Sequence, residues 1–274
     1  MNRFSFFLCI LLLCHSQGLF AQEVFRYGVA PWTNLKLLQS WASPIKNSLE
    51  KQLKNPVQIT SAADVGAYLQ KAIDLKMDAF QVPSHLAVYL IDEHGFQPVI
   101  YVEGRSQVLL VGSARSQFQG LKQASEGQVL LGGPLTITTQ VGKKWFRDAG
   151  LVPQYVYKKD QWKVMDELFS GSNKVGVVMS VMFESLTPVL KSKLIEIKRS
   201  DFFVNGMLLA VPSLDSNTVK KLQQGFLSVK SDEHYFLMSA HIPTEKHMNK
   251  MRNVISPYYS ETVSEINKQL NVKR

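Results

Sequence analysis

The stretch "LGGPLTITTQVGKKWF", residues 131–146, decides how this chain is interpreted. A β-type run leads into two glycines and a proline, after which a helical pattern begins near Thr136. Hydroxyls at Thr136, Thr138 and Thr139 crowd the start of that helix, although threonine is a mediocre helix former and one residue is enough for a cap. Exposed N–H groups and the helix dipole make such a start favourable for anions. The stretch therefore predicts either a helix cap alone or a cradle for an anion.

The same stretch is not a nucleotide-binding P-loop. That motif requires the pattern G-x-x-x-x-G-K-[ST]. Here Lys144 follows Gly142 and Lys143, and Ile137 occupies the place of the first glycine. We therefore do not expect ATP chemistry.

On both sides of this stretch, β-type runs alternate with amphipathic helical segments, which is typical of α/β architecture with mostly parallel strands. We expect strands over residues 24–30, 56–62, 78–82, 97–104, 107–113, 128–132, 154–158, 174–179, 193–200 and 206–212. We expect helices over 35–53, from the cap Asp64 to 75, from Pro83 to 93, and over 121–127, 136–149 and 161–170. The chain after the cap Asp215 is predicted to be helical.

Two α/β series without a flexible linker predict two lobes that share connecting strands. The first lobe is expected to comprise residues 22–105 and 200–274, and the second lobe residues 106–199, with the C-terminal helices packed on the first lobe. Ligands of such folds bind where strands end and helices begin. We therefore expect a ligand cleft between the lobes.

The N-terminus indicates export. Arg3 precedes the apolar run "FFLCILLLC" (6–14), and "GLFA" (18–21) supplies a small-residue cleavage site, so residues 1–21 are predicted to be a signal peptide. The apolar run is shorter than the roughly 18 residues of a spanning helix. Lipoprotein processing at Cys14 is disfavoured because a leucine precedes it. We expect a periplasmic protein.

Composition narrows the function further. Both cysteines, Cys9 and Cys14, lie in the leader, which excludes disulfides and thiol chemistry from the mature chain. The net charge of +9 is spread along the chain, which favours anions but lacks the focused basic face of nucleic-acid binding. The motifs G-x-S-x-G and H-E-x-x-H are absent. We therefore expect a protein that is not an enzyme and has no cofactor. We also expect no metal site, because His234, His241 and His247 are too widely spaced for compact ligation.

A second stretch, "DAFQVPSHLAVYL" (78–90), has the same strand-to-helix pattern. Ser84 and His85 fall in the first turn of its helix, which should face the cleft from the other lobe. Trp32, just beyond the first strand, and Gln161, at another helix start, are further candidates. The alternative for each is structural: a cap, a satisfied polar residue or ordinary packing.

Together these segments resemble the phosphate/phosphite/phosphonate-binding group of periplasmic solute receptors. The likeness rests on "YGVAPW" (27–32), "LQSWASPIKNSLEKQL" (38–53), residues 56–90 and "GPLTITT" (133–139), and its most specific parts are 24–91 and 128–179. The resemblance implies a type II, two-lobe, hinge-closing fold. It also implies that hydroxyls and amides at helix starts hold the ligand's oxyanion.

The family's P-x-S-T-S-G segment falls on Pro134 to Thr139. Thr136 and Thr138 match hydroxyl positions, whereas Ile137 and Thr139 depart from the pattern. The family's G-P-x-x-Y element corresponds to residues 82–86, where Ser84 and His85 replace variable residues and the aromatic is missing. Gln161 stands where the family often has a histidine.

We therefore expect a solute-binding protein that takes up a small anion by hinge closure and passes it to an ABC permease. Thr136, Thr138 and Thr139 would hold the anion from one lobe and Ser84 and His85 from the other. Trp32 would cover the site, and Gln161 would line it. The protein is expected to be a monomer. The alternative is a ligand-sensing subunit for a membrane histidine kinase. A hydrolase on the same scaffold is not expected, because the sequence offers no nucleophile–base pair.

Overall fold

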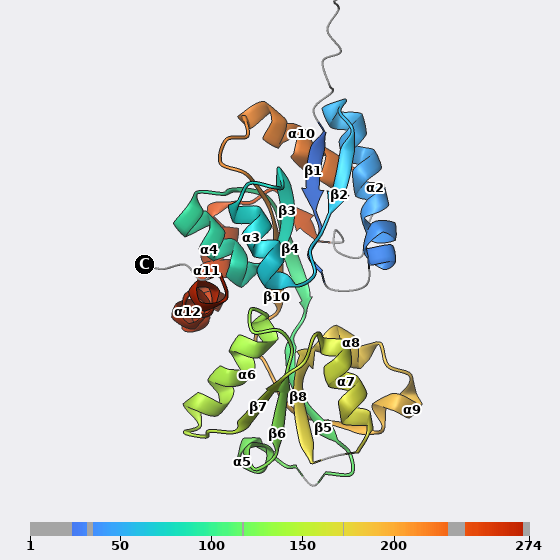
Figure 1. Ribbon diagram of the computed structural model, residues 1–274, viewed down its shortest axis with the longest axis vertical. Helices are drawn as coiled ribbons and strands as arrows, with labels where there is room; N and C mark the ends of the chain where they lie inside the picture. Colours follow the sequence, from blue (N-terminus) through green and yellow to red (C-terminus); the bar gives the residue numbers. More distant parts are fainter. Residues whose placement is uncertain (1–23, 32–34, 117, 172, 230–238, 271–274) are drawn as a thin grey trace, which may run out of the picture.

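The computed structural model describes residues 24–31, 35–116, 118–171, 173–229 and 239–270. The predicted signal peptide, residues 1–21, lies outside them. Figure 1 shows two α/β bodies, one above the other, joined by strands that pass between them. None of the described helices combines the length and apolar character needed to cross a bilayer.

The first lobe is built on a six-stranded sheet in the order β11-β4-β10-β3-β1-β2. Its strands are β1 (Phe25–Gly28), β2 (Val57–Thr60), β3 (Ala79–Pro83), β4 (Gln97–Ser106), β10 (Val204–Ala210) and β11 (Ala240–His241). Its helices are α2 (Leu35–Leu53), α3 (Val65–Ile73), α4 (Ser84–His94) and α10 (Ser216–Leu227). One buried cluster joins α2 and α10 to the sheet, and another joins α3 and α4 to it, so the two pairs cover opposite faces.

The second lobe is built on a five-stranded sheet in the order β7-β6-β8-β5-β9. Its strands are β5 (Val108–Ser113), β6 (Gln128–Leu131), β7 (Gln154–Tyr157), β8 (Lys174–Met179) and β9 (Leu194–Arg199). Its helices are α5 (Leu121–Ser125), α6 (Ile137–Asp148), α7 (Gln161–Phe169), α8 (Ser180–Glu184) and α9 (Pro188–Lys191). The sequence did not predict α8 or α9, which are short.

The expectation of mostly parallel strands is wrong for the pairing. β1 pairs in parallel with β2 and β3, and β6 with β7 and β8. In contrast, β10 is antiparallel to β3 and β4, and β5 is antiparallel to β8 and β9. β5 and β10 each start at the connection between the lobes and run away from it. Their neighbours β3, β4, β8 and β9 run towards that connection, so these pairs are antiparallel.

The C-terminal segment differs from the prediction in two ways. It is not helical throughout, since β11 pairs with β4 before α11 (Glu245–Ile255), the short 3₁₀ helix η2 (Ser256–Tyr258) and α12 (Tyr259–Gln269). It also does not pack on the first lobe alone. Met251 and Ile266 join the first-lobe core, whereas Ile255 and Tyr258 lie in a core cluster of the second lobe. Because Met251 and Ile255 both lie on α11, this one helix reaches both cores, and the segment contacts both lobes.

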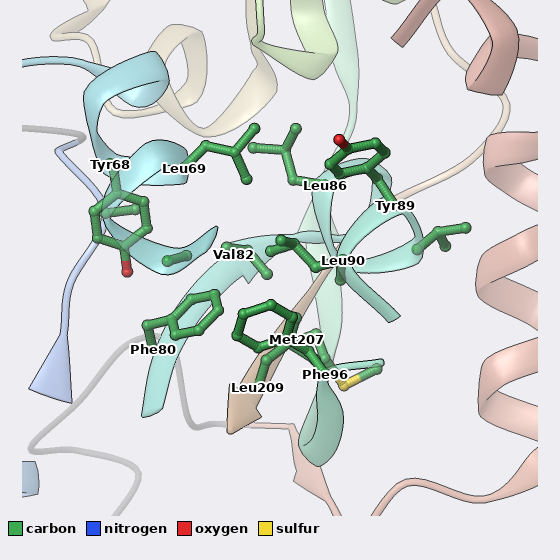
Figure 2. Packing of buried hydrophobic residues seen from close by; sticks show 14 of the residues in the cluster. Tyr68, Leu69, Phe80, Val82, Leu86, Tyr89, Leu90, Phe96, Met207 and Leu209 are labelled. Carbon is green, nitrogen blue, oxygen red and sulfur yellow. The ribbon is translucent and has the colours of Figure 1, made fainter. Parts of the chain in front are cut away.

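Close packing fixes the helices that begin at the interlobe face. Figure 2 shows the first-lobe core, where Leu86 and Leu90 of α4 lie among Phe80 and Val82 of β3. In the second lobe, a Cβ on Gly142 would lie 2.7 Å from a methyl group of Val177, so glycine lets α6 approach β8. Both helices are therefore packed closely against their sheets.

Candidate functional site

The start of α6 carries the predicted threonine cluster. Thr136 is the N-cap, and its hydroxyl accepts a hydrogen bond from the Thr139 N–H at 3.3 Å, so the capping interpretation is confirmed. Thr136 Oγ1 also lies 3.0 Å from Thr138 Oγ1 and donates to the Gly133 carbonyl at 2.9 Å. The structure thus brings the hydroxyls together, as a cradle requires, while the same residues cap the helix.

The three hydroxyls differ in how far they are already occupied. Thr139 Oγ1 donates to the Gly133 carbonyl at 3.1 Å and is fully buried. Thr138 Oγ1, also fully buried, has only the contact with Thr136 Oγ1 among the described residues. Because a hydroxyl rotates to suit its partner, Thr138 is better able than Thr139 to turn towards a ligand.

The start of α4 carries the other predicted pair. Pro83 is the N-cap residue, and its side chain cannot accept a hydrogen bond. The N–H groups of the first turn of α4 are therefore not capped by the Pro83 side chain. Ser84 and His85 are 1% and 0% exposed, which makes both of them interior residues rather than surface ones. The Ser84 hydroxyl has no hydrogen-bond partner in the described structure. This helix start therefore has polar groups still to be satisfied.

His85 joins the two lobes. Its Nε2 lies 2.8 Å from the carbonyl oxygen of Leu135, in the loop that precedes α6. The Leu135 side chain, 2% exposed, packs in the core cluster of the first lobe, opposite its own lobe. Backbone and side chain of Leu135 thus both contact the first lobe, and the two predicted helix starts are held against one another.

The protonation state of His85 follows from its surroundings. Burial lowers the pKa of His85 to about 4, against the weaker raising effect of the Leu135 hydrogen bond. The ring is therefore neutral at neutral pH. Because a carbonyl oxygen only accepts, Nε2 must carry the proton, and Nδ1 is left as an acceptor. Nδ1 is buried and has no partner among the described residues.

Gln140 is a polar residue of this site that the sequence reasoning missed. Its Nε2 donates to the Pro134 carbonyl at 2.8 Å, and its Oε1 is buried without a described partner. Gln140 lies one residue past the threonine cluster, on the buried face of α6. A fully polar side chain at a core position of an amphipathic helix was the signal available in the sequence.

The remaining two candidates are placed differently. Gln161, at the start of α7, accepts a hydrogen bond from the Met179 N–H through Oε1 at 2.8 Å, so half of its amide supports the β8–α8 turn. It also lies beside the start of α6, since a Cβ on Gly132 would be 3.6 Å from Gln161 Cγ. Trp32 lies outside the described residues.

The grouped residues form a neutral polar site. The hydrogen bonds that the structure gives Thr136, Thr138, Thr139, Gln140 and His85 all go to hydroxyls, carbonyls or backbone N–H groups. Such a set can bind an anion through helix-start N–H groups and hydroxyls without a charged partner.

Two hollows on the described surface lie elsewhere. One, of about 430 Å³, is lined by Tyr157, Lys158, Lys159, Lys163, Asp166, Glu167 and Ser170. The other, of about 700 Å³, lies along α11. Neither is lined by a predicted ligand-binding residue. The predicted residues lie instead where His85 contacts Leu135. No group of three or more acidic, histidine or cysteine side chains in the described ranges is placed to hold a metal.

Comparison with known proteins points to one class. A family model described as "ABC transporter, phosphonate, periplasmic substrate-binding protein" matches residues 27–252. Among curated proteins, no sequence matches significantly.

Solved structures share the fold. A binding protein component of an ABC phosphonate transporter from Pseudomonas aeruginosa has 14% identity and a TM-score of 0.69, over 91% of this chain and 96% of its own. A methylphosphonate complex of PhnD1 from Prochlorococcus marinus has 14% identity and a TM-score of 0.69, over 90% and 98%. A Xanthomonas citri protein bound to ATP has 11% identity and a TM-score of 0.70, over 90% and 98%. The predicted two-lobe, type II class is confirmed.

Proposed function

We propose that this chain captures a small phosphonate- or phosphate-like oxyanion and delivers it to an ABC importer. The chain belongs to the family of periplasmic substrate-binding proteins of phosphonate ABC transporters. Members of this family bind solutes and are not enzymes, so the prediction of a non-enzymatic protein is confirmed. The family also implies a periplasmic location and an ABC permease as partner. The ligand and its place in this chain are the parts that we propose.

One observation carries the proposal: the contact between the starts of α4 and α6. The His85–Leu135 hydrogen bond holds Ser84 and His85 against the loop of Thr136 and Thr138, as expected for a ligand shared between lobes. N–H groups and positive dipole ends at two helix starts can stabilise an anion together. The second-lobe hydroxyls would add donors, and Gln161 and Trp32 would complete the lining.

Binding would operate by closure. We place the lobes at residues 22–105 with 200–274 and at 106–199, and the oxyanion contacts both only when they are shut. A ligand with that property shifts the equilibrium towards the closed form. The closed form would then be the one offered to the permease. Export would depend on residues 1–21 as a cleaved signal peptide, and the mass of the protein recovered from the periplasm tests cleavage after Ala21.

A thermal-shift panel tests the ligand class. Methylphosphonate is the first probe because PhnD1 is solved in complex with it, and phosphate, phosphite, sulfate, malate and ATP complete the panel. A ligand at 100 times its dissociation constant stabilises a protein by about 2.7 kcal/mol, which is readily visible as a rise in Tm. We expect a rise with methylphosphonate or phosphate.

The shift must depend on the threonine hydroxyls. Replacing Thr136 and Thr138 by valine keeps their shape, and we expect it to abolish the shift. Thr187→Ala is the matched control, because Thr187 also caps a second-lobe helix but stands before α9 rather than α6. Absence of any shift across the panel in the unmodified protein, or a shift unchanged by the double variant, would contradict the proposal.

A further inference from the structure

Three buried polar atoms lie in the first turns of α4 and α6, whose starts meet at the hydrogen bond between His85 and Leu135. Ser84 Oγ, His85 Nδ1 and Gln140 Oε1 have no hydrogen-bond partner within the described residues. Their side chains are 1%, 0% and 0% exposed. Buried polar atoms in folded proteins are almost always bonded, and an unbonded one is costly. A partner for these atoms is therefore expected when the lobes are closed.

Two of these three atoms can only accept a hydrogen bond. His85 Nε2 is committed as a donor to the Leu135 carbonyl, so Nδ1 of the neutral ring offers a lone pair. Gln140 Nε2 is committed to the Pro134 carbonyl, so Oε1 is its free end. The consecutive carbonyls of Pro134 and Leu135 thus orient one side chain from each lobe, Gln140 and His85. The missing partner must donate hydrogen bonds.

We infer that the ligand is an oxyanion that carries a proton, with His85 Nδ1 accepting the hydrogen bond from its P–OH group. This inference rests on the proposed function and adds a specificity-determining residue to it. A proton-free oxyanion presents only lone pairs and would meet the Nδ1 lone pair with repulsion. A hydrogen phosphonate or hydrogen phosphate instead donates to Nδ1 while its other oxygens accept from hydroxyls and N–H groups.

The electrostatics around His85 favour this arrangement. Burial and the Leu135 hydrogen bond account for its pKa, and no charged side chain of the described ranges contributes to it. At pH values well above 4 the closed form therefore keeps His85 neutral and its Nδ1 available as an acceptor. A cationic histidine would have attracted every oxyanion alike. A neutral acceptor instead distinguishes an oxyanion that carries a proton from one that does not.

Three probes separate charge from protonation. Phosphate keeps a hydroxyl at every pH between about 5.5 and 8.5, sulfate has none, and methylphosphonate loses its only one at its second ionisation. Calorimetric titration of the purified protein across this range should give at least tenfold tighter binding of phosphate than of sulfate. The ratio of methylphosphonate to phosphate affinity should fall about tenfold per pH unit above that ionisation. Ratios cancel pH effects common to all ligands.

A pair of variants assigns the effect to one nitrogen. His85→Gln reaches the Nε2 position, keeps the donor to Leu135 and lacks the Nδ1 acceptor. His85→Asn reaches the Nδ1 position and loses the interlobe hydrogen bond. We expect His85→Gln to lose the phosphate preference over sulfate and the pH-dependent ratio, and His85→Asn to keep both while binding every probe more weakly.

The outcomes distinguish this inference from the function on which it rests. If the unmodified protein binds none of the three oxyanions, the proposed function fails and the inference with it. If it binds phosphate and sulfate equally, or if His85→Gln keeps the full discrimination, the proposed function stands and the inference is overturned. In that case a water molecule, which donates to any acceptor, occupies Nδ1.

Discussion

His85 Nε2 and the carbonyl oxygen of Leu135 lie 2.8 Å apart, and this hydrogen bond connects the starts of two helices on opposite lobes. The two residues are 50 positions apart in the chain. The Leu135 side chain is buried in the core of the first lobe, so the contact has an apolar part as well as a polar one. The loop that carries the threonine cluster is therefore also the loop that contacts the first lobe.

The buried histidine makes stability depend on pH. Burial lowers the pKa of His85 to about 4 from an ordinary value of 6.5. The unfolded chain therefore binds the proton more readily than the folded one. The contribution of neutral His85 to the free energy of unfolding is complete above pH 6.5 and is lost as pH falls towards 4. The free energy of unfolding should fall by about 3 kcal/mol over that range.

Urea denaturation at a series of pH values measures this dependence. The part due to His85 should disappear in His85→Gln, which does not titrate. His241→Gln, at an exposed position, is the matched control and should retain it. An identical pH profile for the unmodified protein and His85→Gln would show that His85 is not buried in the folded state.

Shortening Leu135 should weaken ligand binding without touching the ligand. Leu135→Ala removes apolar surface that the second-lobe loop buries in the first-lobe core, and burying a leucine side chain is worth roughly 1.5–3 kcal/mol. The binding-competent population falls accordingly, and we expect the dissociation constant of methylphosphonate to rise about ten- to a hundredfold. Leu227→Ala, at an exposed position of α10, should leave it unchanged. Calorimetry compares them, and equal affinities would place the closing contact elsewhere.

The C-terminal segment should hold the second lobe through its apolar residues rather than its ion pair. Ile255 is 1% exposed in a second-lobe core cluster, and Ile255→Ala should cost about 2–5 kcal/mol of unfolding free energy. The Arg147–Glu261 pair is 2.5 Å long but partly exposed, so Arg147→Ala should cost at most about 1 kcal/mol. Urea denaturation of the two variants decides between them, and a larger loss for Arg147→Ala would reverse the assignment.

Gly104 should be required at the crossing between the lobes. A Cβ there would lie 1.7 Å from the Val204 carbonyl oxygen, and the Gly104 N–H donates to Asn205 Oδ1 at 2.8 Å beside an irregular step in the β4–β10 pairing. Gly104→Ala must displace the connecting strand, and overpacking typically costs about 1–3 kcal/mol. Gly120→Ala, where a Cβ meets nothing within 4 Å, is the control. Equal Tm values for the two variants would contradict this role.

Local signals made much of the fold predictable. The helix over residues 35–53 was predicted from its apolar period, and the caps Asp64 and Asp215 from their residue type, since all of these depend on neighbours within a few positions. The short strand β11 and the division of the C-terminal helices between the lobes depend on partners far away in the chain.

The site was predictable only in part for the same reason. Threonines after a glycine–proline turn indicated a polar helix start, and the structure brings them together. The interlobe hydrogen bond of His85 and the inward position of Gln140 follow from packing between distant segments. The histidine contact has no signature in the sequence nearby, and for Gln140 the one local signal was a polar side chain on the apolar face of α6.

The most direct test of the central claim is the distance between the lobes with and without ligand. In a chain with Cys9 and Cys14 replaced by serine, spin labels on cysteines introduced at the exposed positions Lys76 and Val152 report it by pulsed electron resonance. We predict that methylphosphonate narrows the distance distribution to a single closed population and that Thr138→Val prevents this. A distribution that methylphosphonate leaves unchanged, while calorimetry shows it bound, would contradict an oxyanion shared between the lobes.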